Sequence, residues 1–179
     1  QFGALAQQAW NASAGDSAAY WLDFCQQNFG FAGAAASAMA AVFIRVDGDA
    51  DSVCPGAMPL ITSCCPGHIV SPLSGPWSSY APQYAFVDDF AALRNQVSGA
   101  ANLDRFDYWN SSFSYLRTGA QLRVLWGNFS ALYKHASGLP AAQQPVYAEQ
   151  TILPVYAAMV AKWQEHMTFV LQVRGFVHE

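Results

Sequence analysis

Two long stretches of the chain place apolar side chains three and four residues apart, the spacing of one face of an α-helix. In the first stretch these positions are Phe106, Trp109, Phe113, Leu116 and Ala120, and apolar content continues to residue 133. In the second they are Ile152, Tyr156, Met159, Trp163, Met167 and Val170. Gly138-Leu139-Pro140 lies between the stretches as a stop and turn. The sequence therefore predicts a long antiparallel helix hairpin.

Shorter helices are predicted on the N-terminal side of this hairpin. Residues 2–13 indicate the end of a short helix, and Asp16 or Ser17 is placed to cap a second helix that ends near Gly30. A third, alanine-rich helix is expected over residues 32–46. Another is predicted from residue 83 to 97, where one helix face is made by Phe86, Phe90, Leu93 and Val97.

Pro154 stands near the start of the last predicted helix, where it either kinks the helix or defines its first turn. Residues 48–82 differ from the rest, since they hold six prolines and four glycines. They predict a long ordered loop, with a short strand over 58–62 as an alternative, and loops of this length usually serve a function or an interface. The expected fold class is mainly α: N-terminal helices (1–48), a Cys/Pro-rich loop (49–82) and a helical hairpin or bundle (83–179) within one domain.

The chain has little charge with which to cover a surface. Charged residues make up 11% of it, against about 25% in typical soluble domains, while apolar residues make up 53%. Sugar or other protein is therefore expected to cover part of the surface. Gln1-Phe2-Gly3 runs straight into helix-like sequence without a signal segment, which favours a fragment of a larger protein.

Two classes of partner are disfavoured by the same composition. The eight basic residues are scattered and the net charge is −4, so the basic stripe that nucleic-acid binding normally needs is missing. No run of about 18 apolar residues predicts a membrane span.

Sequons and cysteines both point to the secretory pathway and to an extracellular or cell-surface location. The sequons for N-glycosylation begin at Asn11, Asn110 and Asn128. The four cysteines are Cys25, Cys54, Cys64 and Cys65. Because neighbouring cysteines rarely bond to each other, one of the adjacent pair is expected to bond Cys54 and the other Cys25, with either assignment open. A zinc site that combines the adjacent pair with His68 is the competing interpretation.

Few residues suggest a catalytic or ligand-binding role. Trp77, Tyr80 and Tyr84 lie on a proline-rich segment and could stack on a polysaccharide, although such rings suit core packing equally well. The carboxylates Asp88, Asp89, Asp104 and Asp107 are candidates for glycoside hydrolysis by type only, and a structural role near helix starts is favoured. Glu149 and Glu165 are expected at the surface.

Other catalytic and metal-binding patterns are incomplete. The run Asp47-Gly48-Asp49-Ala50-Asp51 lacks the later glycine and glutamate of a calcium loop, so a solvated turn is favoured. His68, His135, His166 and His178 belong to no nucleophile elbow, and His166 is expected to be packed or half-exposed on the last helix. No catalytic residue, metal or cofactor is predicted within the chain.

Several short blocks resemble the helical region that follows the catalytic (β/α)8 barrel of large secreted agarase-like glycoside hydrolases. The blocks are Ala4-Leu5-Ala6, Ala9-Trp10-Asn11, Trp21-Leu22-Asp23-Phe24-Cys25, Phe43-Ile44-Arg45-Val46-Asp47-Gly48, Gly75-Pro76-Trp77, Tyr84-Ala85-Phe86-Val87-Asp88, Asn102-Leu103-Asp104-Arg105-Phe106-Asp107-Tyr108-Trp109 and Phe113-Ser114-Tyr115-Leu116-Arg117. The segment from Cys54 to Cys65 departs from that pattern. The resemblance implies that the catalytic carboxylates lie in a barrel upstream of this chain.

The expected function is therefore that of a helical domain of a secreted glycoside hydrolase-like glycoprotein, which supports a barrel outside the chain. Its partners would be the rest of that protein and, through the proline-rich loop, a polysaccharide. The alternative is a structural subunit of an extracellular or cell-surface assembly that uses its low-charge surface as an interface. A free-standing enzyme is the least favoured hypothesis.

Overall fold

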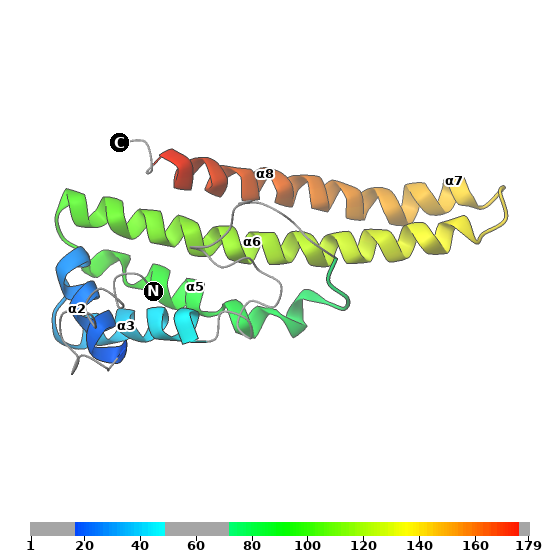
Figure 1. Cartoon of the computed structure of the whole chain (residues 1–179). Coiled ribbons are helices and arrows are strands. Elements are labelled where there is room, and N and C mark those ends of the chain that lie inside the picture. Colours follow the sequence, from blue (N-terminus) through cyan, green and yellow to red (C-terminus); the bar gives the residue numbers. More distant parts are fainter. Residues whose placement is uncertain (1–16, 49–71, 176–179) are drawn as a thin grey trace.

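The computed structural model describes residues 17–48 and 72–175. These residues are mostly helical and include no strand, so the prediction of a mainly α protein is confirmed. Figure 1 shows two long helices, α6 and α8, lying side by side, with the shorter N-terminal helices packed against one half of α6. The other half of α6 continues with α8 beyond the short helices as a two-helix arm.

The first two described helices are α2 (Ser17–Phe29) and α3 (Gly33–Gly48), and they pack against each other. The chain turns between them through Gly30, whose φ of 70° lies in the left-handed region that favours glycine. A Cβ atom at Gly30 would also lie 2.8 Å from Nδ2 of Asn102 on α6. Glycine at this position therefore allows both the turn and the close approach of α6.

The segment that leads to α6 is built from short helices: η1 (Trp77–Ser79), η2 (Ala81–Tyr84), α5 (Phe86–Ala92) and η3 (Arg94–Gln96). The helix predicted over 83–97 is therefore shorter than expected, because the backbone tightens into a 3-10 turn after Leu93. Its predicted inward face is nonetheless correct, since Phe86, Phe90 and Val97 are buried.

Helix α6 (Ala100–Ser137) is about 57 Å long at 1.5 Å per residue. After Gly138 the chain returns through α7 (Gln144–Tyr147), the π-helical turn η4 (Ala148–Ile152) and α8 (Leu153–Gly175), which packs along α6. Pro154 lies in the first turn of α8. In a regular helix its ring would clash with the carbonyl of residue 150, and the π turn lies where this clash would occur.

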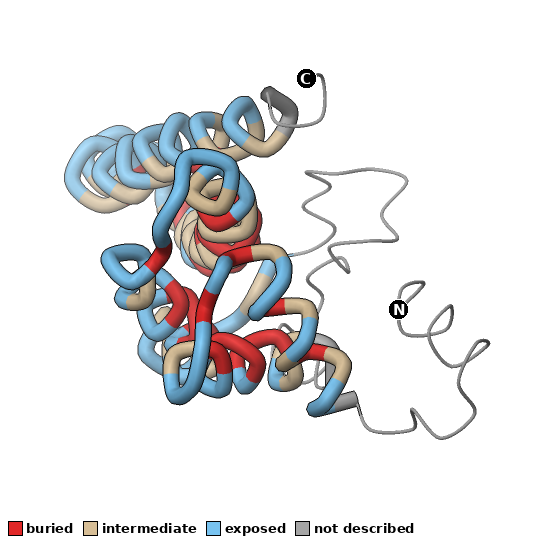
Figure 2. Tube along the Cα trace, turned by 90° about the vertical axis from the view of Figure 1, so that its left-hand side faces the viewer, coloured by how far each residue is buried: buried red, intermediate tan, exposed pale blue. Residues whose placement is uncertain are grey.

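An aromatic core fills the space between α2, α3, α5 and α6. Phe43 of α3 lies at its centre, stacked on Trp21 at 5.0 Å between ring centroids and edge-on to Trp109 at 5.0 Å. Phe90 of α5 stacks on Phe106 of α6 at 4.4 Å. Figure 2 shows the buried residues gathered where the shorter helices meet α6. The apolar stripe predicted on α6 faces this core: Phe106, Phe113, Leu116 and Ala120 are buried, and Trp109 is half-buried.

Four arginine side chains link separate elements around this core. Arg105 of α6 donates to the carbonyl of Asn28 near the end of α2 at 2.7 Å, and Arg45 of α3 donates to the carbonyl of Pro82 in η2 at 3.1 Å. The other two form ion pairs, Arg94–Asp107 and Arg117–Asp88. Half of the eight basic residues of the chain thus join neighbouring elements.

The chain also lies directly on α6 near residue 73. The backbone N–H of Leu73 donates to the carbonyl of Arg123 at 3.0 Å. A Cβ atom at Gly127 would lie 2.0 Å from the carbonyl oxygen of Leu73, so only glycine fits there without a shift of the backbone.

Several predictions fall on residues outside the described ranges: the helix end over 2–13, the strand over 58–62, most of the Cys/Pro-rich loop and the acidic run after Gly48. Within the described part of the chain, no single helix is long and apolar enough to cross a membrane. Only α2 and α3 taken together meet that length and composition, and they are bent by 116° at their junction.

Replacement of Phe43 by alanine should lower the free energy of unfolding by about 3–5 kcal/mol, because it removes the ring at the centre of the core. Urea unfolding followed by circular dichroism measures the change. The matched control is Tyr133→Ala on α6, where the ring is 63% exposed, and its expected cost is at most about 1 kcal/mol. Equal costs for the two variants would contradict the placement of the core.

Candidate functional site

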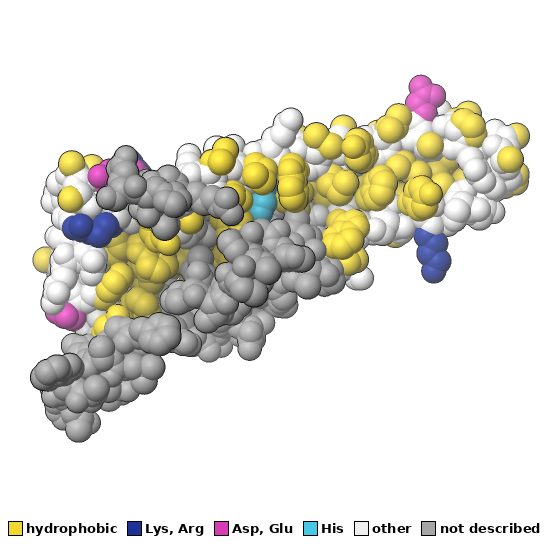
Figure 3. Space-filling model, turned by 45° about the horizontal axis from the view of Figure 1, so that its top comes forward, with side chains coloured by type: hydrophobic (Ala, Val, Ile, Leu, Met, Phe, Trp, Pro, Cys, Tyr) yellow, Lys and Arg dark blue, Asp and Glu magenta, His cyan; other side chains and the backbone are white. Residues whose placement is uncertain are grey.

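The most unusual surface of the described chain is an uncharged row of large apolar side chains along one flank of α8. They are 38–65% exposed, and we name them the α8 flank: Leu153, Tyr156, Val160, Trp163 and Leu171. Their spacing of three, four and eight residues keeps them on one side of the helix. In Figure 3 apolar side chains run along the length of this hairpin.

The α8 flank continues onto α6 at the far end of the hairpin. Phe129 of α6 stacks on Tyr133 at 6.3 Å between ring centroids and lies 6.1 Å from Tyr156 of α8. Tyr133 is 63% exposed. Lys162 and Glu165 of α8 are bound to each other at 2.5 Å, and no charged residue belongs to the flank itself. The surface therefore spans both helices of the arm, and the side chains that form it are large, uncharged and mostly apolar or aromatic.

The inward face of α8 differs from the predicted stripe. The apolar residues of that stripe do not all face inward: Tyr156 and Trp163 are 47% and 46% exposed, whereas Ile152 is buried, as is His166. The spacing of apolar residues could not decide the matter, because α8 carries them on the inner face and on the adjoining flank as well. Helix α6 carries a run of small and polar buried residues, and two of them bond to α8.

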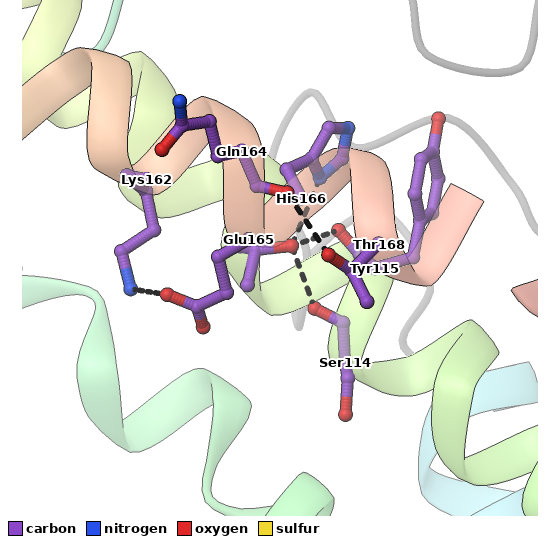
Figure 4. A network of polar contacts seen from close by, with 8 residues as sticks. Ser114, Tyr115, Lys162, Gln164, Glu165, His166 and Thr168 are labelled. Atoms are coloured by element: carbon purple, nitrogen blue, oxygen red, sulfur yellow. Dashed lines mark hydrogen bonds and ion pairs between the residues drawn. The ribbon is translucent and has the colours of Figure 1, made fainter. Parts of the chain in front are cut away.

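We call the contact of these residues with α8 the polar seam. Ser111 of α6 donates to Oε1 of Gln172 at 3.2 Å, and the hydroxyl of Thr118 lies 2.9 Å from Nδ1 of His166. The imidazole of His166 stacks on the ring of Tyr115 at 4.5 Å. Its Cε1 would lie 3.4 Å from a Cβ atom at Gly119, so glycine leaves room for the ring. Figure 4 shows the imidazole of His166 beside the ring of Tyr115.

The imidazole of His166 is enclosed but incompletely bonded. It is 2% exposed, and its Nε2 has no hydrogen-bond partner. Burial lowers the pKa of His166 from its usual 6.5, and a hydrogen bond with the backbone of Tyr115 partly opposes that shift. The expectation of a packed histidine on the last helix fits this position, but its bond to Thr118 had no signal in the spacing of the sequence.

The three aromatic residues proposed to contact a polysaccharide do not form an open platform. Tyr84 is 2% exposed and belongs to the core, so it has no free ring face for a sugar in this conformation. Trp77 and Tyr80 are half-buried: Trp77 packs on Tyr84 at 5.5 Å, and the Tyr80 hydroxyl donates to the carbonyl of Ser74 at 2.7 Å. Because Tyr84 is buried, only Trp77 and Tyr80 remain as candidates for sugar contact.

The candidate carboxylates are placed as structural groups. Asp107 accepts two hydrogen bonds of 2.8 Å from Arg94, and Asp88 pairs with Arg117 at 2.6 Å. Asp89 and Asp104 are exposed on separate helices. Glu149 and Glu165 are exposed, as expected. Asp88 and Asp107 thus hold α5 and η3 against α6.

Two of the three sequons lie on α6 and differ in accessibility. Asn128 is exposed, as the glycosylation hypothesis requires. Asn110 was expected to face solvent, but it is half-buried and its Oδ1 is enclosed without a partner. Ser112, the hydroxyl residue of that sequon, is 3% exposed and donates to the carbonyl of Tyr108 at 2.9 Å. Asn11 lies outside the described residues.

Cys25 is a free thiol in this structure and is fully buried within the aromatic core. Burial raises the pKa of this thiol to about 12, which makes it a poor nucleophile at neutral pH. The disulfide predicted to join Cys25 to the cysteine-rich segment is therefore not formed here. Cys54, Cys64 and Cys65, together with His68 of the competing zinc interpretation, lie outside the described residues.

The chain was compared with protein-family models, with curated proteins and with solved structures, and none of the three comparisons found a match. The features of the chain that bear on its function are the uncharged α8 flank, the polar seam behind it and the sequons.

When the chain is secreted from eukaryotic cells, Asn128 should carry a glycan and Asn110 should not, because only the first side chain has room for a sugar. Mass spectrometry of glycopeptides before and after enzymatic deglycosylation measures both sites. Ser130→Ala should remove the Asn128 glycan, and the matched change Ser112→Ala should leave the glycan pattern of α6 as it was. A glycan on Asn110 would contradict the packing seen around that residue.

Proposed function

We propose that the chain is a helical, non-catalytic module of a larger secreted glycoprotein, in which it supports a glycoside hydrolase-like barrel that lies outside the chain. The single observation that carries this proposal is the α8 flank. A surface helix normally turns its polar side outward, whereas α8 turns five large apolar side chains outward. Exposed apolar rows of this kind mark surfaces that other protein covers.

The placement of the charged residues supports a non-catalytic role for the described part of the chain. Asp88 and Asp107 hold neighbouring elements through arginine, and Asp89 and Asp104 lie on separate helices. The identity of the barrel as glycoside hydrolase-like rests on the resemblance of the sequence blocks between Ala4 and Arg117. The substrate would be bound by the barrel, with Trp77 and Tyr80 as the residues of this chain that could reach a polysaccharide.

The extracellular location belongs to the same proposal. It draws on the sequons, of which Asn128 is exposed on α6, and on the low share of charged residues, 11% of the chain. A glycan at Asn128 would add solubility near the arm. Protein docked on the α8 flank would cover the apolar surface that remains.

A second candidate is a structural subunit of an extracellular assembly, and the shape of the hairpin favours it. The arm formed by α6 and α8 reaches beyond the core, and its apolar surface extends to Tyr133 at the far end. An arm of this kind suits contact with a neighbouring subunit. The two candidates differ in what covers the flank: a barrel in the same polypeptide, or another chain.

Hydroxyl-radical footprinting of Tyr156, Trp163 and Leu171 tests whether the flank is covered. In the isolated 179-residue chain these side chains should be oxidised readily, and in the native protein purified from its source they should be protected at least fivefold. The intact mass of the native polypeptide then separates the candidates, since a barrel in the same chain requires a mass far above 19.4 kDa. A native monomer of 19.4 kDa with an unprotected flank would exclude both candidates.

Substitution on the flank gives an independent check. Leu171→Gln should weaken docking in the native protein while changing the stability of the isolated chain by less than about 1 kcal/mol, because the side chain is 65% exposed. The matched control is Ala158→Gln, an exposed position on the opposite flank of α8. Limited proteolysis of the native protein measures docking, and equal behaviour of the two variants would argue against the flank as the contact surface.

A further inference from the structure

Helix α8 is attached to the rest of the described chain differently from the other helices. The aromatic core draws its residues from α2, α3, the η1–α5 segment and α6, and among the described residues none comes from α8. Helix α8 packs along α6 and continues from η4. Within the contact between α6 and α8, the polar seam is the part that buries a titratable side chain, His166. An element that lies outside a core can open separately from it.

The hydrogen bonds around Thr118 indicate which nitrogen of the His166 imidazole carries the proton. The Thr118 hydroxyl has one proton, and it lies within bonding distance of two backbone carbonyls, those of Ser114 at 2.9 Å and Tyr115 at 3.1 Å. With that proton donated to a carbonyl, the hydroxyl accepts from the ring, so Nδ1 of His166 carries the hydrogen. The bare nitrogen is then Nε2, which is buried without a partner.

A second proton on this ring would have no acceptor. Protonation of Nε2 would place an N–H group and a full positive charge in an enclosed site, and both are costly without a partner. Among the described residues, no carboxylate contacts the ring. From α6 it is faced by Tyr115, Thr118 and Gly119, with Arg123 one turn further along.

The charged groups on α8 offer no compensation either. Lys162 lies one turn before His166, and Glu165 precedes it directly, but these two are paired with each other at 2.5 Å. The Trp163 ring, 6.1 Å away between centroids, is the remaining aromatic neighbour on α8. The surroundings thus accept a neutral imidazole and resist a charged one.

We propose that His166 is an acid-sensitive latch, which holds α8 on α6 while its ring is neutral and releases α8 when the ring takes up a proton. The proton binds Nε2, and the imidazolium gains water on both nitrogens only when α8 separates from α6. The aromatic core stays folded, because it does not include α8. The latch is a property of the seam and does not depend on what covers the α8 flank.

The direction of the pH dependence follows from the buried ring. The released imidazole titrates near its usual pKa of 6.5, whereas the docked one has a lowered pKa. Release therefore binds a proton, and docking is strongest above pH 6.5 and weakens as the pH falls below it. At pH 5.0 the ratio of open to docked α8 should rise by up to about 30-fold over its value at pH 7.5, because the free ring is then about 97% protonated.

Hydrogen exchange followed by mass spectrometry, corrected for intrinsic rates, tests the latch in the full 179-residue chain at pH 7.5 and pH 5.0. Peptides from 153–173 should lose protection by more than tenfold at the lower pH, and peptides from α2, α3 and α5 should not. In His166→Gln, which cannot titrate, the pH-dependent loss should disappear. The matched control is His135→Gln, an exposed histidine at the far end of α6, which should respond like the unmodified chain.

Other outcomes would overturn the proposal. They are equal loss of protection in core and α8 peptides, no loss in either, and retention of the response in His166→Gln. If that variant fails to fold, the His166 ring can be followed by nuclear magnetic resonance in the unmodified chain. The latch requires the ring to become charged over the same pH range in which α8 loses protection. A ring that titrates while α8 stays protected would exclude it.

Discussion

Aromatic packing on one face of α6 is the interaction on which the arrangement of α2, α3 and α5 depends. Rings from α2, α3 and α5 meet those of Phe106 and Phe113 in edge-on, tilted and stacked pairs. Each edge-on or stacked pair contributes about 0.5–1.5 kcal/mol beyond the burial of its apolar area. Aromatic side chains lose little conformational entropy on burial, so a core of this kind can be built by short helices. The arginine contacts at the edges of the core add links between neighbouring elements.

The opposite face of α6 follows a different principle. Small and hydroxyl-bearing residues allow α8 to approach closely and to bond through Ser111 and Thr118. The helix that docks there hides a histidine and leaves its large apolar residues on an adjoining flank. One long helix therefore carries an aromatic core on one face and a contact that includes buried polar groups on the other. The proposed module needs both, since a rigid body has to position a surface that another part of the protein covers.

The sequence predicted where the helices lie better than it predicted which face of each helix is buried. The spacing from Phe106 to Ala120 predicted α6 and its buried stripe, because apolar residues there occur on one side only. In α8 they occur around most of the helix, so the spacing could not show that Trp163 faces outward. Tyr84 was a candidate for sugar contact because residue type does not reveal burial. The seam was missed because Thr118 and His166 are 48 residues apart and meet only when the two helices pack.

The π turn at Ala148–Ile152 changes the angular positions of the side chains in the second helix of the hairpin. Its Leu153 N–H bonds to the carbonyl of Ala148, so this turn holds one more residue than the turns on either side. The extra residue makes this turn wider, and it does not add a further rotation of the chain about the helix axis. Counting by 3.6 from α7 into α8 would misplace each later side chain by about 100°. The angular position of the outward-facing row on α8 thus depends on the π turn at Ala148–Ile152.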